Sequence, residues 1–213
     1  MTRRLCCVRC TRPMSACICR WVAALATRVD LLILQHPMET ANAKGSARLL
    51  HLGVANSRLA EGEAFDPALL QALLHADGRV PVLLYPDTPD APGAPLAGAL
   101  LAEPAALRLV VLDGTWRKSR KMLHQNPLLQ ALPRLPLTQM PASHYLIRKA
   151  HAPDQLSTLE ASCHALAQLD PGADVQPMLA AFDAFVAHFQ ATGGRLDLPA
   201  HACTVLETGR GAA

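Results

Sequence analysis

Three short apolar runs restrict the fold of this chain more than any other feature of its sequence. They span residues 29–34, 80–85 and 107–112, and each is apolar at nearly every position. A strand with one face in water alternates apolar and polar residues, whereas a parallel strand covered by helices on both faces is apolar throughout. The runs therefore predict strands of a mostly parallel sheet.

Helical patterns lie between and after these runs, as an α/β fold requires. Asp66 and Pro67 predict a helix start, because Asp is a good N-cap and Pro suits the first helical position. Ser157 and Glu160 have the spacing of a capping box, and residues 175–190 repeat apolar side chains with helical periodicity. We therefore predict an α/β fold with helices on both faces of the sheet.

Length and composition exclude several classes of protein. The 213 residues suffice for one large domain, and a net charge of +3 permits a nucleic-acid partner without requiring one. The longest apolar runs are too short to cross a bilayer. The start of the chain lacks the long apolar core of a secretory signal. We expect a soluble, cytoplasmic protein with no membrane contact, and the pattern leaves open a monomer or a homodimer.

Four cysteines near the start of the chain predict a structural zinc site. Cys7, Cys10, Cys17 and Cys19 are spaced C-x2-C-x6-C-x-C, and four thiolates complete a tetrahedral zinc site without an open position for catalysis. Disulfides are disfavoured in a reducing compartment, and metal-free reduced thiols are the alternative. The expected organisation is a zinc-binding module at 1–22, a main domain at 23–208 and a disordered tail at 209–213.

Polar motifs follow two of the predicted strands. Ligands of open α/β sheets bind at the carboxyl ends of the strands, so we expect both motifs at one edge of the sheet. The first motif, QHPMETANAKGSARLL, contains Gln35, His36 and Glu39, and then Lys44 and Arg48 near a helix start that suits an anion. A His-Pro turn by itself is more often structural than catalytic.

The second motif, DGTWRKSRKM, begins at Asp113. This carboxylate either caps the following helix or accepts a proton or a ligand amine at the sheet edge. Trp116 either packs in the core or stacks on a nucleobase. Arg117, Lys118 and the cations after them form either a solvated helix face or a contact surface for a polyanion.

A third motif, YLIRKAHAPDQLSTLEA, carries Arg148 and Lys149 ahead of the Ser157 capping box. The hydroxyls of Ser157 and Thr158, with the amides of the first helical turn, offer donors for a carboxylate. A lone capping box, however, usually satisfies only the donors of its own helix.

The cysteine cluster and the three polar motifs, in this order, resemble the DTW-domain family. The family is named for an Asp-x-Thr-Trp motif, which is present here at residues 113–116. The resemblance covers Cys7 to about Ala161 and continues into the following helices. It implies a SPOUT-like fold, knotted or unknotted. It also implies a tRNA-uridine aminocarboxypropyltransferase, which moves the 3-amino-3-carboxypropyl group of S-adenosyl-L-methionine to uridine N3. Relatives often carry more basic residues before Lys44, a departure expected to affect RNA contacts but not the chemistry.

The resemblance and the chemistry of this transfer together assign roles to residues. Asp113 is the expected base or orienting group for uridine N3–H, and Trp116 either stacks on the flipped uracil or packs beneath the Asp113 turn. The expected catalytic residues are Asp113, Thr115 and Trp116. The expected residues for S-adenosyl-L-methionine are Gln35, His36, Pro37, Glu39, Leu112, Asp113, Gly114, Leu156, Ser157, Thr158 and Glu160. The expected RNA contacts are Lys44, Arg48, Arg117, Lys118, Arg148 and Lys149. A SPOUT-type methyltransferase and a non-catalytic zinc-containing RNA-binding protein are the alternatives.

Overall fold

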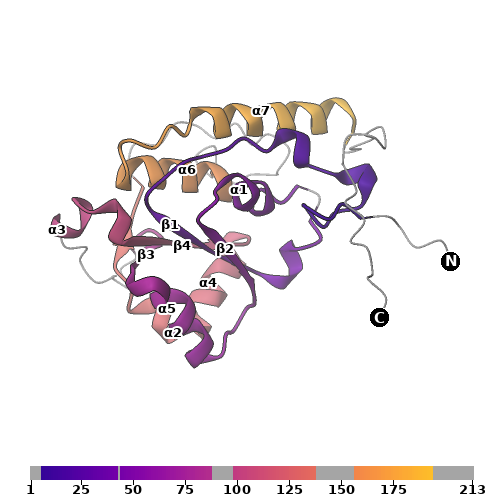
Figure 1. Cartoon of the computed structure of the whole chain (residues 1–213). Helices are drawn as coiled ribbons and strands as arrows, with labels where there is room; N and C mark the ends of the chain where they lie inside the picture. Colours follow the sequence, from indigo (N-terminus) through magenta and orange to yellow (C-terminus); the bar gives the residue numbers. More distant parts are fainter. Residues whose placement is uncertain (1–5, 43, 88–97, 138–155, 194–213) are drawn as a thin grey trace, which may run out of the picture.

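A five-stranded parallel sheet forms the centre of the computed structural model, which describes residues 6–42, 44–87, 98–137 and 156–193 (Figure 1). The strand order is β2-β1-β4-β3-β5, and every pairing between neighbours is parallel, which confirms the predicted sheet. The strands are β1 Asp30–Gln35, β2 Ser57–Glu61, β3 Val80–Leu84, β4 Leu107–Asp113 and β5 Arg134–Leu135.

Helices cover both faces of the sheet, as the apolar runs predict. α1, α6 and α7 lie on one face, and α2, α4 and α5 lie on the other (Figure 1). The α-helices are α1 Ala47–Gly53, α2 Pro67–His75, α3 Gly98–Leu101, α4 Trp116–Gln125, α5 Pro127–Gln130, α6 Thr158–Leu169 and α7 Gln176–Ala191. The short 3-10 helices are η1 Met14–Ala16, η2 Cys19–Trp21, η3 Pro37–Glu39, η4 Ala76–Gly78 and η5 Pro104–Ala106.

Alternate residues of the central strands face two separate hydrophobic clusters. In β1, Leu31 and Ile33 pack toward α6 and α7, whereas Leu32 and Leu34 pack toward α2 and α4, and all four are fully buried. A sheet that is buried on both faces needs apolar side chains at nearly every position. This explains why the three runs are apolar almost throughout.

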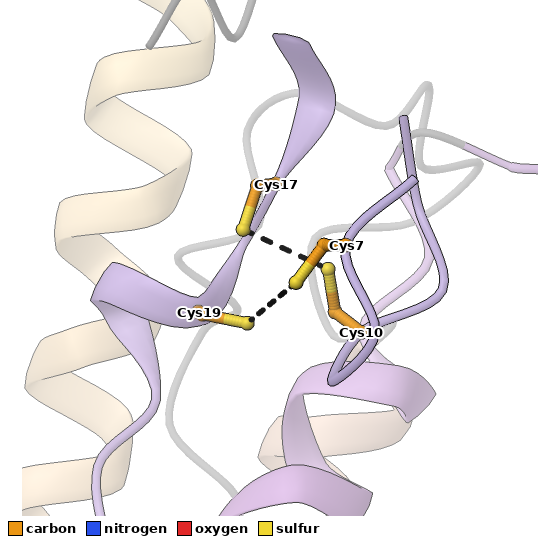
Figure 2. A group of neighbouring side chains, drawn as sticks. All are labelled: Cys7, Cys10, Cys17 and Cys19. Carbon is orange, nitrogen blue, oxygen red and sulfur yellow. Dashed lines mark hydrogen bonds between the residues drawn. The ribbon is translucent and has the colours of Figure 1, made fainter. Parts of the chain in front are cut away.

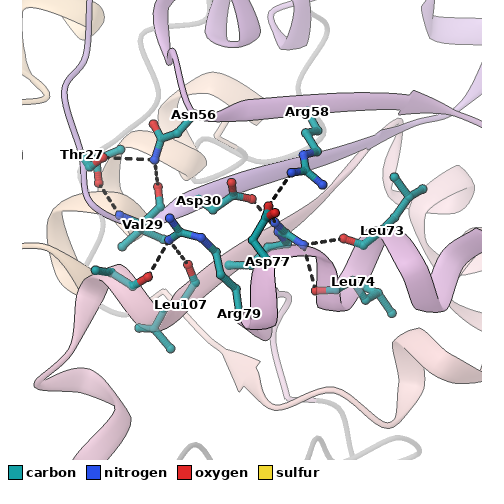
Figure 3. A network of polar contacts seen from close by, with 12 residues as sticks. Thr27, Val29, Asp30, Asn56, Arg58, Leu73, Leu74, Asp77, Arg79 and Leu107 are labelled. Atoms are coloured by element: carbon teal, nitrogen blue, oxygen red, sulfur yellow. Dashed lines mark hydrogen bonds and ion pairs between the residues drawn. The ribbon is translucent and has the colours of Figure 1, made fainter.

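The amino edge of the sheet contains a fully buried arginine, and Figure 3 labels its partners Asp30, Leu73, Leu74 and Asp77. Arg108, in β4, donates from Nε to the carboxylate of Asp30 in β1. Its Nη1 donates to the carbonyls of Leu73 and Leu74 at the end of α2, at 2.7 and 3.2 Å, and its Nη2 lies 3.5 Å from Asp77. One guanidinium therefore ties two strands to a helix without leaving a buried nitrogen unpaired.

The cysteine-rich segment packs against the main body of the protein. Cys10, Ile18 and Trp21 are buried in the same hydrophobic cluster as α6 and α7. The ring of Trp21 meets that of Phe185 edge-on, with centroids 5.3 Å apart. A domain boundary at residue 22 and a knotted, SPOUT-like topology stay predictions. The tail at 209–213 lies outside the described residues.

No helix in the described ranges is long and apolar enough to cross a bilayer.

Candidate active site at the carboxyl edge of the sheet

The register of the sheet brings the first two motifs together. β1 and β4 are neighbours, and the last residue of β1, Gln35, pairs with the last residue of β4, Asp113. The motifs that follow these strands therefore begin side by side at the carboxyl edge, where open α/β sheets bind ligands.

Asp113 is buried, and other motifs hold its carboxylate on both sides. Gln35 Nε2 donates to Oδ2 at 2.8 Å, and Thr158 Oγ1, from the first residue of α6, donates to Oδ1 at 2.6 Å. Asp113 does not cap α4: that position belongs to Thr115, whose Oγ1 accepts from the amide of Lys118 at 3.4 Å.

An open pocket lies beside Asp113. The space in this pocket is about 370 Å³, a figure that includes open solvent at its mouth. The lining combines acceptors and donors from all three motifs, so it suits a ligand that carries both signs of charge. The lining residues are Glu39, Asn42, Lys44, Gly45, Ser46, Asp113, Gly114 and Thr158.

One wall of the pocket is a loop held by polar contacts. Glu39 Oε1 accepts from Lys118 Nζ at 2.7 Å, and its Oε2 accepts from Asn42 Nδ2 at 2.9 Å. The Asn42 side chain in turn accepts from the amide of Lys44 at 3.0 Å. Lys118, expected to contact RNA, is thus ion-paired with a pocket residue. Nothing in the sequence pattern singled out Asn42.

His36 is not among the residues that line the pocket, and its ring belongs to a second network of polar contacts. Its Nδ1 accepts from the amide of Met38 at 3.1 Å, so its Nε2 donates to Glu63 Oε1 at 2.9 Å. Lys121 Nζ lies 3.0 Å from the other oxygen of Glu63. The hydrogen bond from His36, followed by that from Lys121, lowers the pKa of Glu63. No sequence pattern pointed to Glu63, which lies outside all three motifs.

The start of α6 has the predicted capping box. Ser157 Oγ accepts from the amide of Glu160 at 3.1 Å, and Glu160 Oε2 accepts from the amide of Ser157 at 2.7 Å. The amide of Leu159 donates to the buried Ser46 Oγ at 3.3 Å. These amides are therefore occupied within the protein, and the Thr158 side chain is the part of this helix start that lines the pocket. Leu156 is half-buried beside the box.

Trp116 combines the two interpretations that the sequence left open. Its ring stacks on that of Tyr85, with centroids 5.2 Å apart and planes 10° apart, yet 52% of the residue is exposed. Tyr85 follows β3 directly and is buried. The indole is therefore a supported platform with accessible surface, at the same sheet edge as Asp113.

The expected RNA-binding cations differ in their surroundings. Arg117 and Lys44 are exposed, and Lys44 Nζ lies 5.8 Å from the ring centroid of Phe189. Arg48 is partly buried, with a nitrogen 3.9 Å from Glu61. Arg148 and Lys149 lie outside the described residues.

The four predicted zinc ligands converge (Figure 2). All four sulfur atoms lie within 4.8 Å of one another, with 3.6 Å between Cys7 and Cys19 and 3.8 Å between Cys10 and Cys17. A tetrahedral zinc with Zn–S bonds of about 2.3 Å places its sulfurs about 3.8 Å apart, so the cluster fits this ion. Burial raises the pKa of the Cys10 and Cys19 thiols, and a bound cation would favour the thiolates.

Arg12 connects the cysteine cluster to the pocket. Its carbonyl accepts from the amide of Cys7 at 2.8 Å, and its Nη2 donates to the carbonyls of Asn42 and Gly45 at 3.3 and 3.0 Å. Both of these loop residues line the pocket. The sequence showed Arg12 only as one of several basic residues around the cysteines.

The chain is similar to several known proteins. A tRNA-uridine aminocarboxypropyltransferase 2 from Drosophila melanogaster is 30% identical over 188 residues, which cover 83% of this chain and 71% of that protein. The protein of the same name from Macaca fascicularis is 30% identical over 186 residues, covering 83% of this chain and 60% of the relative. The tRNA-uridine aminocarboxypropyltransferase A of Arabidopsis thaliana is 26% identical over 134 residues, covering 57% of this chain and 51% of that protein.

No solved structure matches the chain significantly. The model of the DTW domain, however, matches residues 4–190, a span that contains the cysteine cluster, both strand-end motifs and the start of α6. The chain belongs to the DTW domain family.

Proposed function

We propose that this protein is a tRNA-uridine aminocarboxypropyltransferase, which transfers the 3-amino-3-carboxypropyl group of S-adenosyl-L-methionine to N3 of a uridine in tRNA. The observation that carries the proposal is the Asp113 carboxylate. It is held by Gln35 and Thr158 at the wall of an open pocket, in a chain whose relatives bear this name. The proposal includes a SPOUT-like fold and a cytoplasmic location, and it leaves open a monomer or a homodimer.

The pocket supports this choice of donor through its mixed lining. An aminocarboxypropyl group carries an ammonium and a carboxylate, and the walls offer Glu39 and Asp113 as acceptors and Lys44, Ser46 and Thr158 as donors. S-adenosyl-L-methionine, when bound, supplies a carbon activated by the neighbouring sulfonium. The carbon that reacts is decided by orientation in the site, because each carbon attached to the sulfonium is activated.

Asp113 has the position and the hydrogen bonds of a proton acceptor. Uridine N3 carries a proton at neutral pH and becomes nucleophilic when that proton is removed. Each carboxylate oxygen has more than one lone pair, so the hydrogen bonds from Gln35 and Thr158 do not by themselves prevent Asp113 from accepting the N3 proton. The new N3–C bond then forms as the C–S bond breaks, and the sulfur leaves with its electron pair.

Trp116 and the cations would place the RNA. The exposed part of the indole offers a stacking surface for a nucleobase, and Arg117 beside it is exposed to the solvent. A structural zinc on the four cysteines would hold the adjoining segment in shape, and with four protein ligands it keeps no position for a substrate.

Nucleoside mass spectrometry tests the proposal. Purified protein is incubated with unmodified tRNA and S-adenosyl-L-methionine, and the digested RNA is searched for aminocarboxypropyl-uridine. A methylated uridine would instead identify a SPOUT-type methyltransferase. A protein that binds tRNA but shows no S-adenosyl-L-methionine binding in calorimetry would be a zinc-containing RNA-binding protein, and the proposal would be wrong.

A further inference from the structure

Arg134 is a buried arginine whose guanidinium has no hydrogen-bond partner in the described part of the chain. It begins β5 and is 4% exposed, and its Nε, Nη1 and Nη2 are all buried and unbonded. Arg108 is also buried but donates to Asp30, Leu73 and Leu74. The protein alone satisfies Arg108, whereas Arg134 has no acceptor among the described residues.

The described neighbours of Arg134 contact its side chain but provide no hydrogen-bond acceptor. Its Cζ lies 5.2 Å from the ring centroid of Tyr85, and an aromatic face attracts a cation but does not replace in-plane hydrogen-bond acceptors. Burial lowers the pKa of Arg134, while the nearby Tyr85 and Asp87 side chains act in the opposite direction. An arginine stays charged at neutral pH. A buried charge without an acceptor is costly, and an anion would remove that cost.

The unpaired guanidinium belongs to the carboxyl edge of the sheet. The Tyr85 ring contacts both Arg134 and Trp116, and Trp116 begins α4 only three residues after Asp113. Strand β5 pairs with β3 at Leu83 and Leu84, directly before Tyr85. The cation is therefore joined to the Asp113 turn through two stacked rings. A guanidinium fork matches the paired oxygens of a carboxylate or a phosphate.

We propose that Arg134 binds an oxyanion of a substrate, pairing its guanidinium with a carboxylate or phosphate oxygen beside the Trp116–Tyr85 stack. This inference rests on the proposed function, which supplies two sources of such an oxyanion. One is the carboxylate of the methionine part of S-adenosyl-L-methionine. The other is a phosphate of the RNA next to the base on Trp116.

Binding measurements on Arg134→Gln separate the two sources. Isothermal calorimetry gives the Kd of S-adenosyl-L-methionine and of its decarboxylated analogue, and anisotropy gives the Kd of tRNA over a range of salt concentrations. For a carboxylate, the variant binds S-adenosyl-L-methionine about tenfold or more weakly, and its affinity for the decarboxylated analogue equals that of the wild type. For a phosphate, tRNA binding weakens and the slope of log Kd against log salt falls by about one.

Arg58→Gln is the control that removes the same charge elsewhere. Arg58 lies on β2, where its Nη2 is 2.5 Å from Asp77, and the variant is expected to bind both ligands like the wild type. The melting temperature without ligand is a second measurement, and a structural role of Arg134 would lower it in the variant. Removing an unpaired buried charge leaves the melting temperature of Arg134→Gln equal to or above that of the wild type.

Two results would overturn the inference. One is a ligand-free Arg134→Gln protein that melts below the wild type, because Arg134 would then have a structural partner. The other is unchanged affinity for both S-adenosyl-L-methionine and tRNA. If wild-type protein modifies no tRNA while Arg134→Gln still loses affinity for one ligand, the proposed function fails and the anion site stands.

Discussion

At the scale of single residues, Asp113 is a proposed proton acceptor and is also held in the fold by hydrogen bonds from Gln35 and Thr158. A variant that keeps its size but not its charge distinguishes these two roles. Asp113→Asn keeps the size of the side chain but removes the charge and the capacity to take up a proton. We expect kcat for aminocarboxypropyl transfer to fall by about 10²–10⁴-fold, with little change in the affinity for tRNA. Rapid-quench measurement of the modified nucleoside gives the rate, and circular dichroism verifies the fold. A variant with wild-type kcat would exclude Asp113 as the base.

Trp116 allows a second test at this scale, because its ring rests on Tyr85 while half of it is exposed. Loss of a stacked base costs about 1–3 kcal/mol, so Trp116→Ala is expected to raise the KM for tRNA by about 5–150-fold. Trp116→Phe keeps an aromatic face and is expected to restore most of the affinity. Equal KM values for Trp116→Ala and the wild type would mean that the ring only packs on Tyr85.

At the scale of elements, Arg12 transmits the position of the cysteine segment to the pocket loop. Its hydrogen bonds to the carbonyls of Asn42 and Gly45 come from a charged donor, and such bonds contribute about 1.5–3 kcal/mol each. We expect Arg12→Ala to weaken S-adenosyl-L-methionine binding about tenfold in calorimetry, while the bound zinc, measured by atomic absorption, stays constant. Arg9→Ala, a change at a neighbouring exposed arginine, is the matched control. Full affinity in Arg12→Ala would show that the loop keeps its shape unaided.

The junction between α6 and β1 has a carboxylate that responds to pH. Asp170, at the end of α6, accepts from Thr27 Oγ1 and from the amide and side chain of Arg28. The hydrogen bond from the Arg28 side chain is the largest of the contacts that lower the pKa of Asp170. A lowered pKa in the folded state gives stability that is present above the ordinary aspartate pKa of about 3.9 and is lost as the pH falls further.

Asp170→Asn therefore tests this contribution directly. The variant is expected to melt below the wild type at neutral pH, and the difference should shrink as the pH falls below about 4. Melting curves at a series of pH values measure it. A constant difference across the series would show that the ionisation of Asp170 does not contribute to stability.

The elements that could be predicted from the sequence are those with a complete local signal. The buried strands β1, β3 and β4 are apolar at most positions, and α2 and α6 begin with the side-chain caps that Asp66 and Ser157 provide. Strand β2 is a half-exposed edge with mixed residues, and β5 has only two residues, so neither leaves a detectable pattern. The crossover connections of the sheet determine the positions of Glu63, Tyr85 and Arg134. No local sequence pattern reveals these connections.

At the scale of the whole molecule, the zinc site and the hydrophobic core share side chains. Cys7, Cys10 and Cys17 lie in the cluster that also contains Trp21 and Phe185. We expect metal removal by a chelator, or Cys10→Ser, to lower the melting temperature of the entire protein in one transition. Differential scanning calorimetry measures this, and Cys6→Ser, at an exposed cysteine outside the cluster, is the control. A separate low-temperature transition with an unchanged main transition would instead identify residues 1–22 as an independent module.

The hydrogen bonds that Gln35 and Thr158 make to Asp113 have a consequence for synthesis on the ribosome. Gln35 and Asp113 are 78 positions apart, and Thr158 follows Asp113 by 45. Strand β1 emerges early but finds its neighbour β4 only after β2, α2 and β3 have been made. Such long-range pairing slows folding and leaves strand edges open meanwhile. The site of the nascent chain is therefore incomplete until α6 has emerged. A message truncated before that point would yield a product without Thr158, and its open strand edges would bind chaperones.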